Sequence, residues 1–125
     1  MKVLVVDDQL EIRELLCSIL ESGGFSTQQA SDGLDAMEKH KAEPSDIWLL
    51  DIFMPNLDGL ETIKLIRKKQ PDLPIICMSS PGMGGKNDYT AIGKRFGATA
   101  TLHKPFKPNE VLDLVKDTLK IHTPS

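Results

Sequence analysis

The chain has 125 residues, of which 40% are hydrophobic and 26% charged, and its formal net charge at pH 7 is −3. This composition is typical of one globular domain, and it excludes a basic nucleic-acid-binding surface because charges of both signs are interspersed and aromatic residues are few. No apolar run reaches the ~20 residues that span a bilayer, and the opening MKVLVV is too short for a secretory signal. We therefore expect a cytoplasmic protein with Cys17 and Cys77 as reduced core thiols.

The first strand and helix are predicted from apolar spacing. Residues 3–6 (VLVV) form a continuous apolar run, which predicts a strand covered on both faces. Residues 10–21 predict a helix that ends at Gly23 and Gly24. Its apolar face is formed by Ile12, Leu15, Leu16, Ile19 and Leu20.

The middle of the chain repeats this cycle. Residues 25–30 predict a more polar strand near a sheet edge, and residues 34–41 predict a short helix. We expect Leu34 and Met37 of that helix to face inward. A buried apolar strand follows at 47–50.

The second half continues the alternation. Residues 57–69 predict a helix, 75–78 a strand, 88–96 a weak helix and 99–103 a strand. The last helix begins near Pro108, because proline is well accommodated in a first turn. Its inward stripe is Val111, Leu114, Val115, Thr118 and Leu119.

Five strands alternating with five helices predict a parallel α/β sheet with helices on both faces, joined by right-handed crossovers. We expect one domain over residues 1–122 and a frayed tail at 123–125.

Polar residues follow four of the five apolar runs. These endings are Asp7-Asp8, Asp51, Ser79-Ser80 and His103-Lys104-Pro105. Because the carboxyl ends of parallel strands meet at one edge of a sheet, we expect these side chains to lie close together. Each ending alone has a structural explanation, since Asp8 or Gln9 can cap a helix and a single lysine is usually solvated. Their coincidence favours a functional site.

The residue types at this edge suit phosphoryl chemistry. Three clustered carboxylates repel one another, and a hard divalent cation such as Mg²⁺ removes that cost while contacting phosphate oxygens. Lys104 offers a positive charge and Ser79 a hydroxyl for the other phosphate oxygens. Asp51, on the central strand, can attack phosphorus to form an acyl phosphate.

The segments VLVVDD, LLDIFMPNLDGLE, IICMSS and HKPF together resemble the receiver domain of two-component response regulators, of the kind found in chemotaxis regulators. The resemblance extends over essentially the whole chain. It implies a flavodoxin-like doubly wound (βα)5 fold with strand order 2-1-3-4-5, and a phosphoacceptor rather than an enzyme. A histidine kinase or histidine phosphotransfer protein would supply the phosphoryl group. An unknown downstream protein would read the helix 4–strand 5–helix 5 surface, and a phosphorylation-dependent homodimer is left open.

The resemblance also implies a role for each site residue. Asp51 matches the phosphoacceptor, and the Mg²⁺ ligands would be Asp8, Asp51, the backbone carbonyl of Phe53 and, through water, Asp7. Ser79 matches the switch hydroxyl, beside Ser80, and Lys104 the phosphate-contacting lysine before Pro105, which we expect in cis linkage. Structural residues of the site would be Pro55, Asp58, Gly59 and Pro105.

One strand position departs from the family's pattern, and two positions that flank the site bear on the rate of dephosphorylation. The family often has an aromatic residue midway along the fifth strand, coupled to the switch hydroxyl, and here that position is Thr101. A threonine cannot make the buried-to-exposed rotamer change of an aromatic ring. Phe53 lies two residues after Asp51, and Pro81 lies two residues after Ser79. Neither side chain can hydrogen-bond an attacking water, so we expect slow self-dephosphorylation.

Other functions fit less well. GMGGKND lacks the first glycine and the hydroxyl residue of a phosphate-binding P-loop. Flavin mononucleotide binding would place a phosphate against Asp7 and Asp8. A haloacid-dehalogenase-type phosphatase needs a second aspartate where Phe53 stands. The alternative that stays open is a receiver fold used as a phosphorylation-independent protein-binding module.

Overall fold

The computed structural model describes residues 1–52, 59–79 and 89–122, with the backbone alone at 89–92 and 121–122. Within these residues, five strands alternate with five helices. The strands are β1 (Lys2–Val6), β2 (Ser26–Ala30), β3 (Ile47–Asp51), β4 (Ile75–Ser79) and β5 (Ala100–His103). The helices are α1 (Leu10–Ser22), α2 (Gly33–Ala42), α3 (Gly59–Lys69), α4 (Tyr89–Phe96) and α5 (Pro108–His122).

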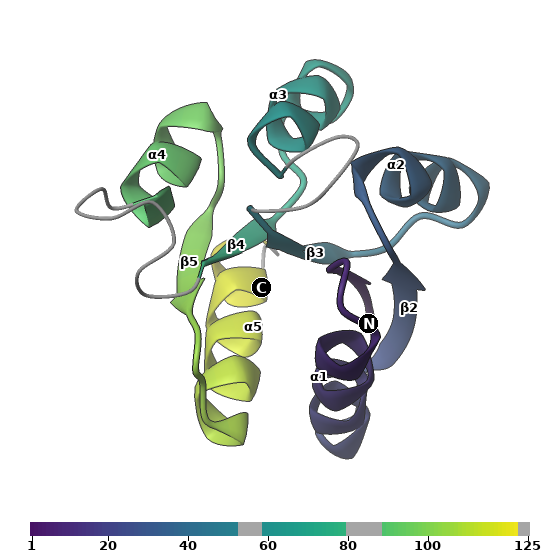
Figure 1. The fold of residues 1–125 in the computed structure, drawn as a ribbon, viewed down its shortest axis with the longest axis vertical. Coiled ribbons are helices and arrows are strands. Elements are labelled where there is room, and N and C mark those ends of the chain that lie inside the picture. The colour runs from purple at the N-terminus through teal and green to yellow at the C-terminus, as the bar shows by residue number, and fades with distance from the viewer. Residues whose placement is uncertain (53–58, 80–88, 123–125) are drawn as a thin grey trace.

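The strands form one parallel sheet in the order β2-β1-β3-β4-β5, which confirms the expected topology. Helices α1 and α5 cover one face of the sheet, and α2, α3 and α4 cover the other (Figure 1). The polar strand β2 lies at an edge, as its sequence predicted. No helix in the described ranges has the length and apolar character needed to cross a membrane.

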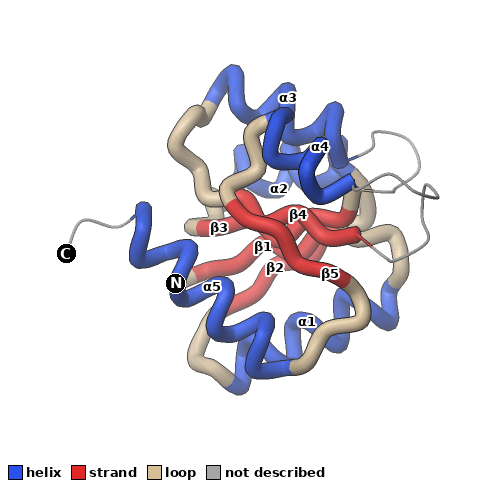
Figure 2. The backbone as a smooth tube through the Cα atoms, turned by 90° about the vertical axis from the view of Figure 1, so that its left-hand side faces the viewer, coloured by secondary structure: helices blue, strands red, loops and turns tan. Residues whose placement is uncertain are grey.

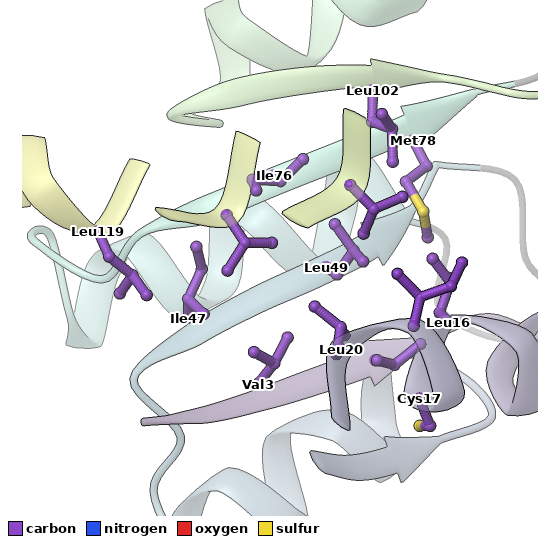
Figure 3. Packing of buried hydrophobic residues seen from close by; sticks show 14 residues of the cluster. Val3, Leu16, Cys17, Leu20, Ile47, Leu49, Ile76, Met78, Leu102 and Leu119 are labelled. Atoms are coloured by element: carbon purple, nitrogen blue, oxygen red, sulfur yellow. The ribbon is translucent and has the colours of Figure 1, made fainter. Parts of the chain in front are cut away.

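Alternation along each strand produces two hydrophobic clusters. Val3 and Val5 of β1 face α1 and α5, whereas Leu4 and Val6 face α2 and α3. Each fully buried large side chain contributes roughly 1.5–3 kcal/mol to folding. Figure 3 shows the first cluster between the sheet and its two helices. Its labelled members are Val3, Leu16, Cys17, Leu20, Ile47, Leu49, Ile76, Met78, Leu102 and Leu119.

Both cysteines are buried and neither forms a disulfide, as expected for reduced core thiols. Cys17 lies in the cluster under α1, and Cys77 lies in the cluster on the opposite face.

Two leucines expected in the core are exposed. Leu34 is 56% exposed and Leu15 is 50% exposed, so both predictions were wrong. In α2 the buried positions are Gly33, Ala36 and His40, which share a face that excludes Leu34. In α1 the buried face is centred on Leu16 and Leu20 with Cys17 and Ile19 beside them, which leaves Leu15 at its margin.

The buried histidine of α2 has a partner for each ring nitrogen. His40 Nδ1 accepts from the Ser45 N–H at 3.1 Å and from the Trp48 Nε1–H at 3.0 Å. Its Nε2 lies 3.0 Å from Gln70 Oε1 on α3, so Nε2 carries the proton and donates. These bonds explain how a polar side chain is accommodated on the buried face of α2.

The parallel arrangement gives the sheet two distinct edges. Every strand starts at the edge where the chain begins and where α5 ends (Figure 2). The opposite edge collects the carboxyl ends of all the strands in the sheet.

Candidate functional site

The predicted site residues in the described ranges converge on the carboxyl edge of the sheet. Asp7 directly follows β1, Asp51 and Ser79 are the last residues of β3 and β4, and Lys104 directly follows β5. Strand pairing aligns Asp51 with Met78, next to Ser79, and the Lys104 N–H donates to the Ser79 carbonyl at 2.8 Å. Residues far apart in sequence are therefore adjacent here because the strands are parallel and in register.

Three carboxylates form the acidic part of this site. One oxygen from each of Asp7, Asp8 and Asp51 lies within 4.8 Å of the others. Asp7 is fully buried, Asp51 is 6% exposed and Asp8 is exposed. Hard oxygen donors at this spacing fit a divalent cation such as Mg²⁺, which prefers carboxylate and water ligands.

Lys104 balances part of this negative charge. Its Nζ lies 2.8 Å from Asp7 Oδ2 and 3.4 Å from Asp51 Oδ2. Burial acts to lower the pKa of Lys104, but the hydrogen bond with Asp7 and the charges of Asp51 and Asp7 outweigh it and raise that pKa. Lys104 is therefore a fixed cation at the mouth of the acidic group.

Asp7 is held through all of its polar atoms. Its N–H donates to the Ala30 carbonyl at 3.2 Å, and its Oδ1 accepts from the Gln9 N–H at 2.9 Å. Its carbonyl accepts from Arg13 Nη1 at 2.7 Å, and Oδ2 accepts from Lys104. Gln9 stands at the N-cap of α1 without a side-chain capping bond, so α1 begins through this aspartate-based turn.

Gly59 packs directly behind the central aspartate. A Cβ at this position would lie 2.4 Å from the Asp51 carbonyl oxygen and 2.6 Å from the Ile52 Cα. The Gly59 N–H also donates to the Ile52 carbonyl at 2.9 Å. Only glycine allows α3 to start this close to the end of β3.

The remaining predicted residues divide into two groups. Thr101 is half-buried in β5 and aligned with Cys77 of β4, and the Lys104–Pro105 peptide is cis, as expected. Phe53, Pro55, Asp58, Ser80 and Pro81 lie outside the described residues, so the expectations for them stay predictions.

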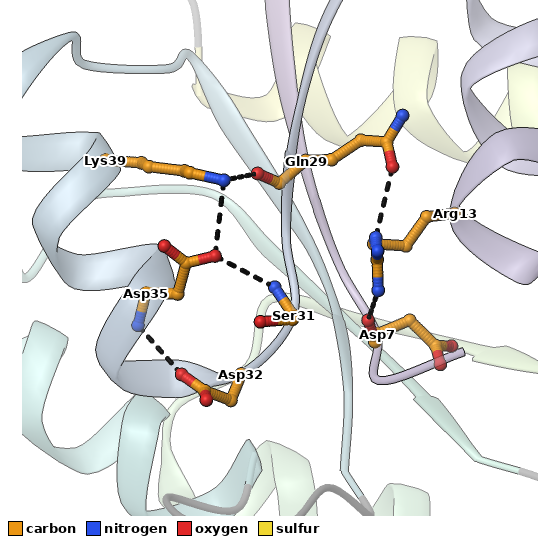
Figure 4. A network of polar contacts seen from close by, with 7 residues as sticks. All are labelled: Asp7, Arg13, Gln29, Ser31, Asp32, Asp35 and Lys39. Carbon is orange, nitrogen blue, oxygen red and sulfur yellow. Dashed lines mark hydrogen bonds and ion pairs between the residues drawn. The ribbon is translucent and has the colours of Figure 1, made fainter. Parts of the chain in front are cut away.

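The sequence reasoning did not identify a polar network that supports the site from β2 (Figure 4). Arg13 joins the Asp7 carbonyl to the Gln29 side chain, with Nε 3.1 Å from Gln29 Oε1. Lys39 of α2 donates to the Gln29 carbonyl at 2.6 Å and pairs with Asp35 at 3.2 Å. The available signal was an arginine in the first turn of α1, where its side chain can reach back to the strand ends.

Comparisons with known proteins agree with this geometry. A family model described as "Response regulator receiver domain" matches residues 3–116. The transcriptional regulatory protein CpxR homolog of Haemophilus influenzae is 37% identical over 119 residues, which cover 95% of this chain and 50% of that protein. Sporulation initiation phosphotransferase F of Bacillus subtilis is 35% identical over 120 residues, which cover 96% of this chain and 94% of that protein.

Solved structures share the same fold. The receiver domain of NtrX from Brucella abortus superposes with a TM-score of 0.86 at 32% identity, over 94% of this chain and 98% of that one. Against CpxR homolog and the alkaline phosphatase synthesis regulator PhoP of Bacillus subtilis, this chain spans about half of the relative's length.

Proposed function

Because this chain belongs to the response regulator receiver domain family, whose members are phosphoacceptors in two-component signalling, we propose that Asp51 accepts a phosphoryl group from a phosphohistidine. The donor would be a histidine kinase or a histidine phosphotransfer protein. The observation that carries the proposal is the cluster of Asp7, Asp8 and Asp51 with Lys104 at the end of the central strand.

The proposed reaction is a direct displacement at phosphorus. A carboxylate oxygen of Asp51 forms the new P–O bond as the P–N bond of the donor breaks, and the leaving imidazole nitrogen takes up a proton from water. Lys104 already lies 3.4 Å from Asp51 Oδ2, close enough to contact an oxygen of the transferred group. Its ammonium offsets the charge that the phosphoryl group brings to a nearly buried site.

We further propose that Asp8 and Asp51 hold a Mg²⁺ ion, with the Phe53 carbonyl as a third protein ligand and Asp7 acting through water. When bound, the ion neutralises charge on the phosphoryl oxygens. The burial and four partners of Asp7 suit a supporting role, whereas Asp8 is exposed and accessible to an ion from solvent.

Signalling would start at Ser79, whose hydroxyl is drawn to the phosphoryl group. Ser79 and Cys77 share one face of β4, because alternate residues of a strand point the same way. A Cβ on Gly93 of α4 would lie 2.6 Å from Cys77 Sγ, so α4 packs almost directly on this strand. The contact supports transmission from β4 to the α4–β5–α5 surface without an aromatic residue at Thr101.

Docking of the phosphoryl donor would use the surface around the acidic group. Leu10 is the first residue of α1 and Leu34 the second residue of α2, and these helices follow the carboxyl ends of β1 and β2. Leu15 lies further along α1. All three are at least half exposed. Exposed apolar side chains beside a charged site offer a surface to which a partner protein can bind. A small-molecule phosphoryl donor would not need such a surface.

Relatives such as CpxR homolog are about twice the length of this chain, so the receiver domain is only part of those proteins. We propose that the chain is a cytoplasmic phosphoacceptor rather than a turnover enzyme. In its phosphorylated form it acts on a downstream protein or forms a homodimer. The alternative function is a phosphorylation-independent binding module with the same fold.

The direct test is Asp51→Asn, which replaces the nucleophilic carboxylate with a neutral amide while keeping the side-chain shape. We expect transfer of ³²P from a histidine kinase or acetyl phosphate to be abolished, with the circular dichroism spectrum unchanged. Asp113→Asn, at an exposed position of α5, is the matched control and should label like the unsubstituted chain. Labelling of Asp51→Asn at the wild-type level would refute the acceptor assignment.

Titration with beryllofluoride, a phosphoryl analogue, separates the two candidate functions. A phosphorylation-controlled switch should show Mg²⁺-dependent shifts of backbone NMR resonances that spread from Asp51 to α4 and β5. A binding module that has lost phosphorylation should show none.

A further inference from the structure

We propose that Arg13 is the positioning residue that aims the Asp8 carboxylate at the cation site, and that it does so through the main chain. The inference rests on the proposed function, since it concerns the affinity of the same site for Mg²⁺. It assigns a role to a side chain that contacts neither the ion nor the phosphoryl group.

The geometry concerns a single peptide unit. Arg13 Nη1 donates to the Asp7 carbonyl oxygen at 2.7 Å, a short charge-assisted hydrogen bond. That oxygen lies in the same plane as the N–H and Cα of Asp8, because the peptide bond is planar. Fixing the Asp7 carbonyl therefore fixes the N–Cα bond of Asp8, which carries its side chain, and narrows the directions open to the carboxylate.

Asp8 depends on this restraint because its own side chain is exposed. Within the described residues, no hydrogen bond or ion pair holds its carboxylate, whereas the Asp7 carboxylate is held by Gln9 and Lys104. The acidic pair thus consists of one side chain fixed by direct bonds and one fixed through its backbone.

The guanidinium is itself restrained from the neighbouring strand. Arg13 Nε donates to Gln29 Oε1 at 3.1 Å, and Lys39 Nζ donates to the Gln29 carbonyl at 2.6 Å (Figure 4). The main chain of Gln29 is paired with Val5 of β1 in the parallel ladder. Side chains from α1 and α2 therefore both bind Gln29 near the end of β2. Arg13 is restrained by this contact and in turn restrains the Asp7–Asp8 peptide.

The test measures Mg²⁺ affinity by isothermal titration calorimetry on the unphosphorylated chain. Arg13→Lys keeps the positive charge but cannot span both acceptors with a planar fork, and we expect Mg²⁺ binding about tenfold weaker, as for other outer-shell supports. Gln29→Met leaves the net charge unchanged and removes the restraint on Arg13 together with a contact to the Cys17 thiol in the core. It should weaken binding in the same direction by a smaller factor.

Gln28→Met is the matched control. It makes the same substitution one residue earlier on β2, at a side chain whose Oε1 has no hydrogen-bond partner among the described residues. Its dissociation constant for Mg²⁺ should equal that of the unsubstituted chain. In phosphorylation by acetyl phosphate, Arg13→Lys should raise the half-saturating Mg²⁺ concentration while the extent of labelling at saturating Mg²⁺ stays the same.

The results distinguish this inference from the proposed function. Unchanged Mg²⁺ affinity in both Arg13→Lys and Gln29→Met, with normal binding by the unsubstituted chain, would overturn the role of Arg13 alone. Absence of Mg²⁺ binding by the unsubstituted chain would overturn the site itself. If Arg13→Lys fails to fold, the charge-neutral Gln29→Met comparison with Gln28→Met still decides.

Discussion

At the scale of single residues, Gly59 shows how the backbone shapes the site. Its missing side chain lets α3 begin in contact with the main chain of Asp51 and Ile52. We expect Gly59→Ala to destabilise the fold by about 1–3 kcal/mol, because the added methyl overlaps backbone atoms that no rotamer change can move. The midpoint of urea unfolding measures this loss.

Gly23→Ala is a suitable comparison for that substitution. A Cβ there would lie 2.4 Å from Leu112 Cδ2, the end of a flexible side chain that can rotate away. Its cost should be smaller than that of Gly59→Ala. Equal stability of the two variants would contradict the close-packing explanation for Gly59.

At the scale of secondary-structure elements, Arg67 connects α3 to the turn between α4 and β5. Its Nε donates to the Gly97 carbonyl at 2.8 Å, Nη1 to the Gln70 carbonyl at 3.1 Å and Nη2 to Thr99 Oγ1 at 3.3 Å. Burial lowers the pKa of this guanidinium, which its carbonyl partners nevertheless hold in place. The C-terminal end of α4 is therefore anchored, and any movement of α4 should pivot about this end.

Removing that anchor should loosen one end of α4. In Arg67→Ala we expect faster hydrogen exchange at the Ala98 amide, which bonds to the Gly93 carbonyl at 3.0 Å, and little change in β1. Arg95→Ala, an exposed position in α4, is the control. Exchange at Ala98 that matches this control would remove Arg67 as the anchor.

At the scale of the whole molecule, alkaline pH should weaken the fold in two steps. Burial raises the pKa of the Cys17 thiol above its usual 9.0, so the folded chain keeps a proton that the unfolded chain releases. Stability therefore falls as pH rises beyond 9.0. The pKa of Lys104 is raised from 10.5, so the stabilisation from its ion pairs is present below that pH and is lost as pH rises through the folded value.

The first step can be isolated with Cys17→Ala. This variant should be less stable at pH 7, because a buried side chain is truncated, yet its melting temperature should decline less steeply between pH 9 and 10. Thermal unfolding over a pH series gives both slopes. Parallel slopes in the two proteins would exclude the thiol as the source of the decline.

Much of this architecture could be predicted from the sequence because both signals involved are local. Apolar runs and their polar endings located the strands within two residues and placed Asp7, Asp51 and Lys104 at one edge. The strand order came from the resemblance to a family, since apolar periodicity does not specify which strands are neighbours.

The errors and omissions arose where a contact depends on three-dimensional partners. Leu34 is exposed because the inward face of α2 is formed by Gly33, Ala36 and His40. A histidine on that face is favourable only once Trp48, Ser45 and Gln70 are in place. Arg13 was missed because it acts on a carbonyl oxygen, and a backbone acceptor leaves no trace in the residue types of a sequence.

The opposite polarity of the two sheet edges has a practical consequence. The start of β1 and the end of α5 both lie at the edge opposite the carboxyl ends of the strands (Figure 2). Asp51, the last residue of β3, is at the carboxyl edge. An affinity tag, a fluorophore or a tether to a biosensor chip placed at either end would therefore leave the acceptor side open to solution. Kinetics recorded on immobilised protein should consequently match those of the free chain.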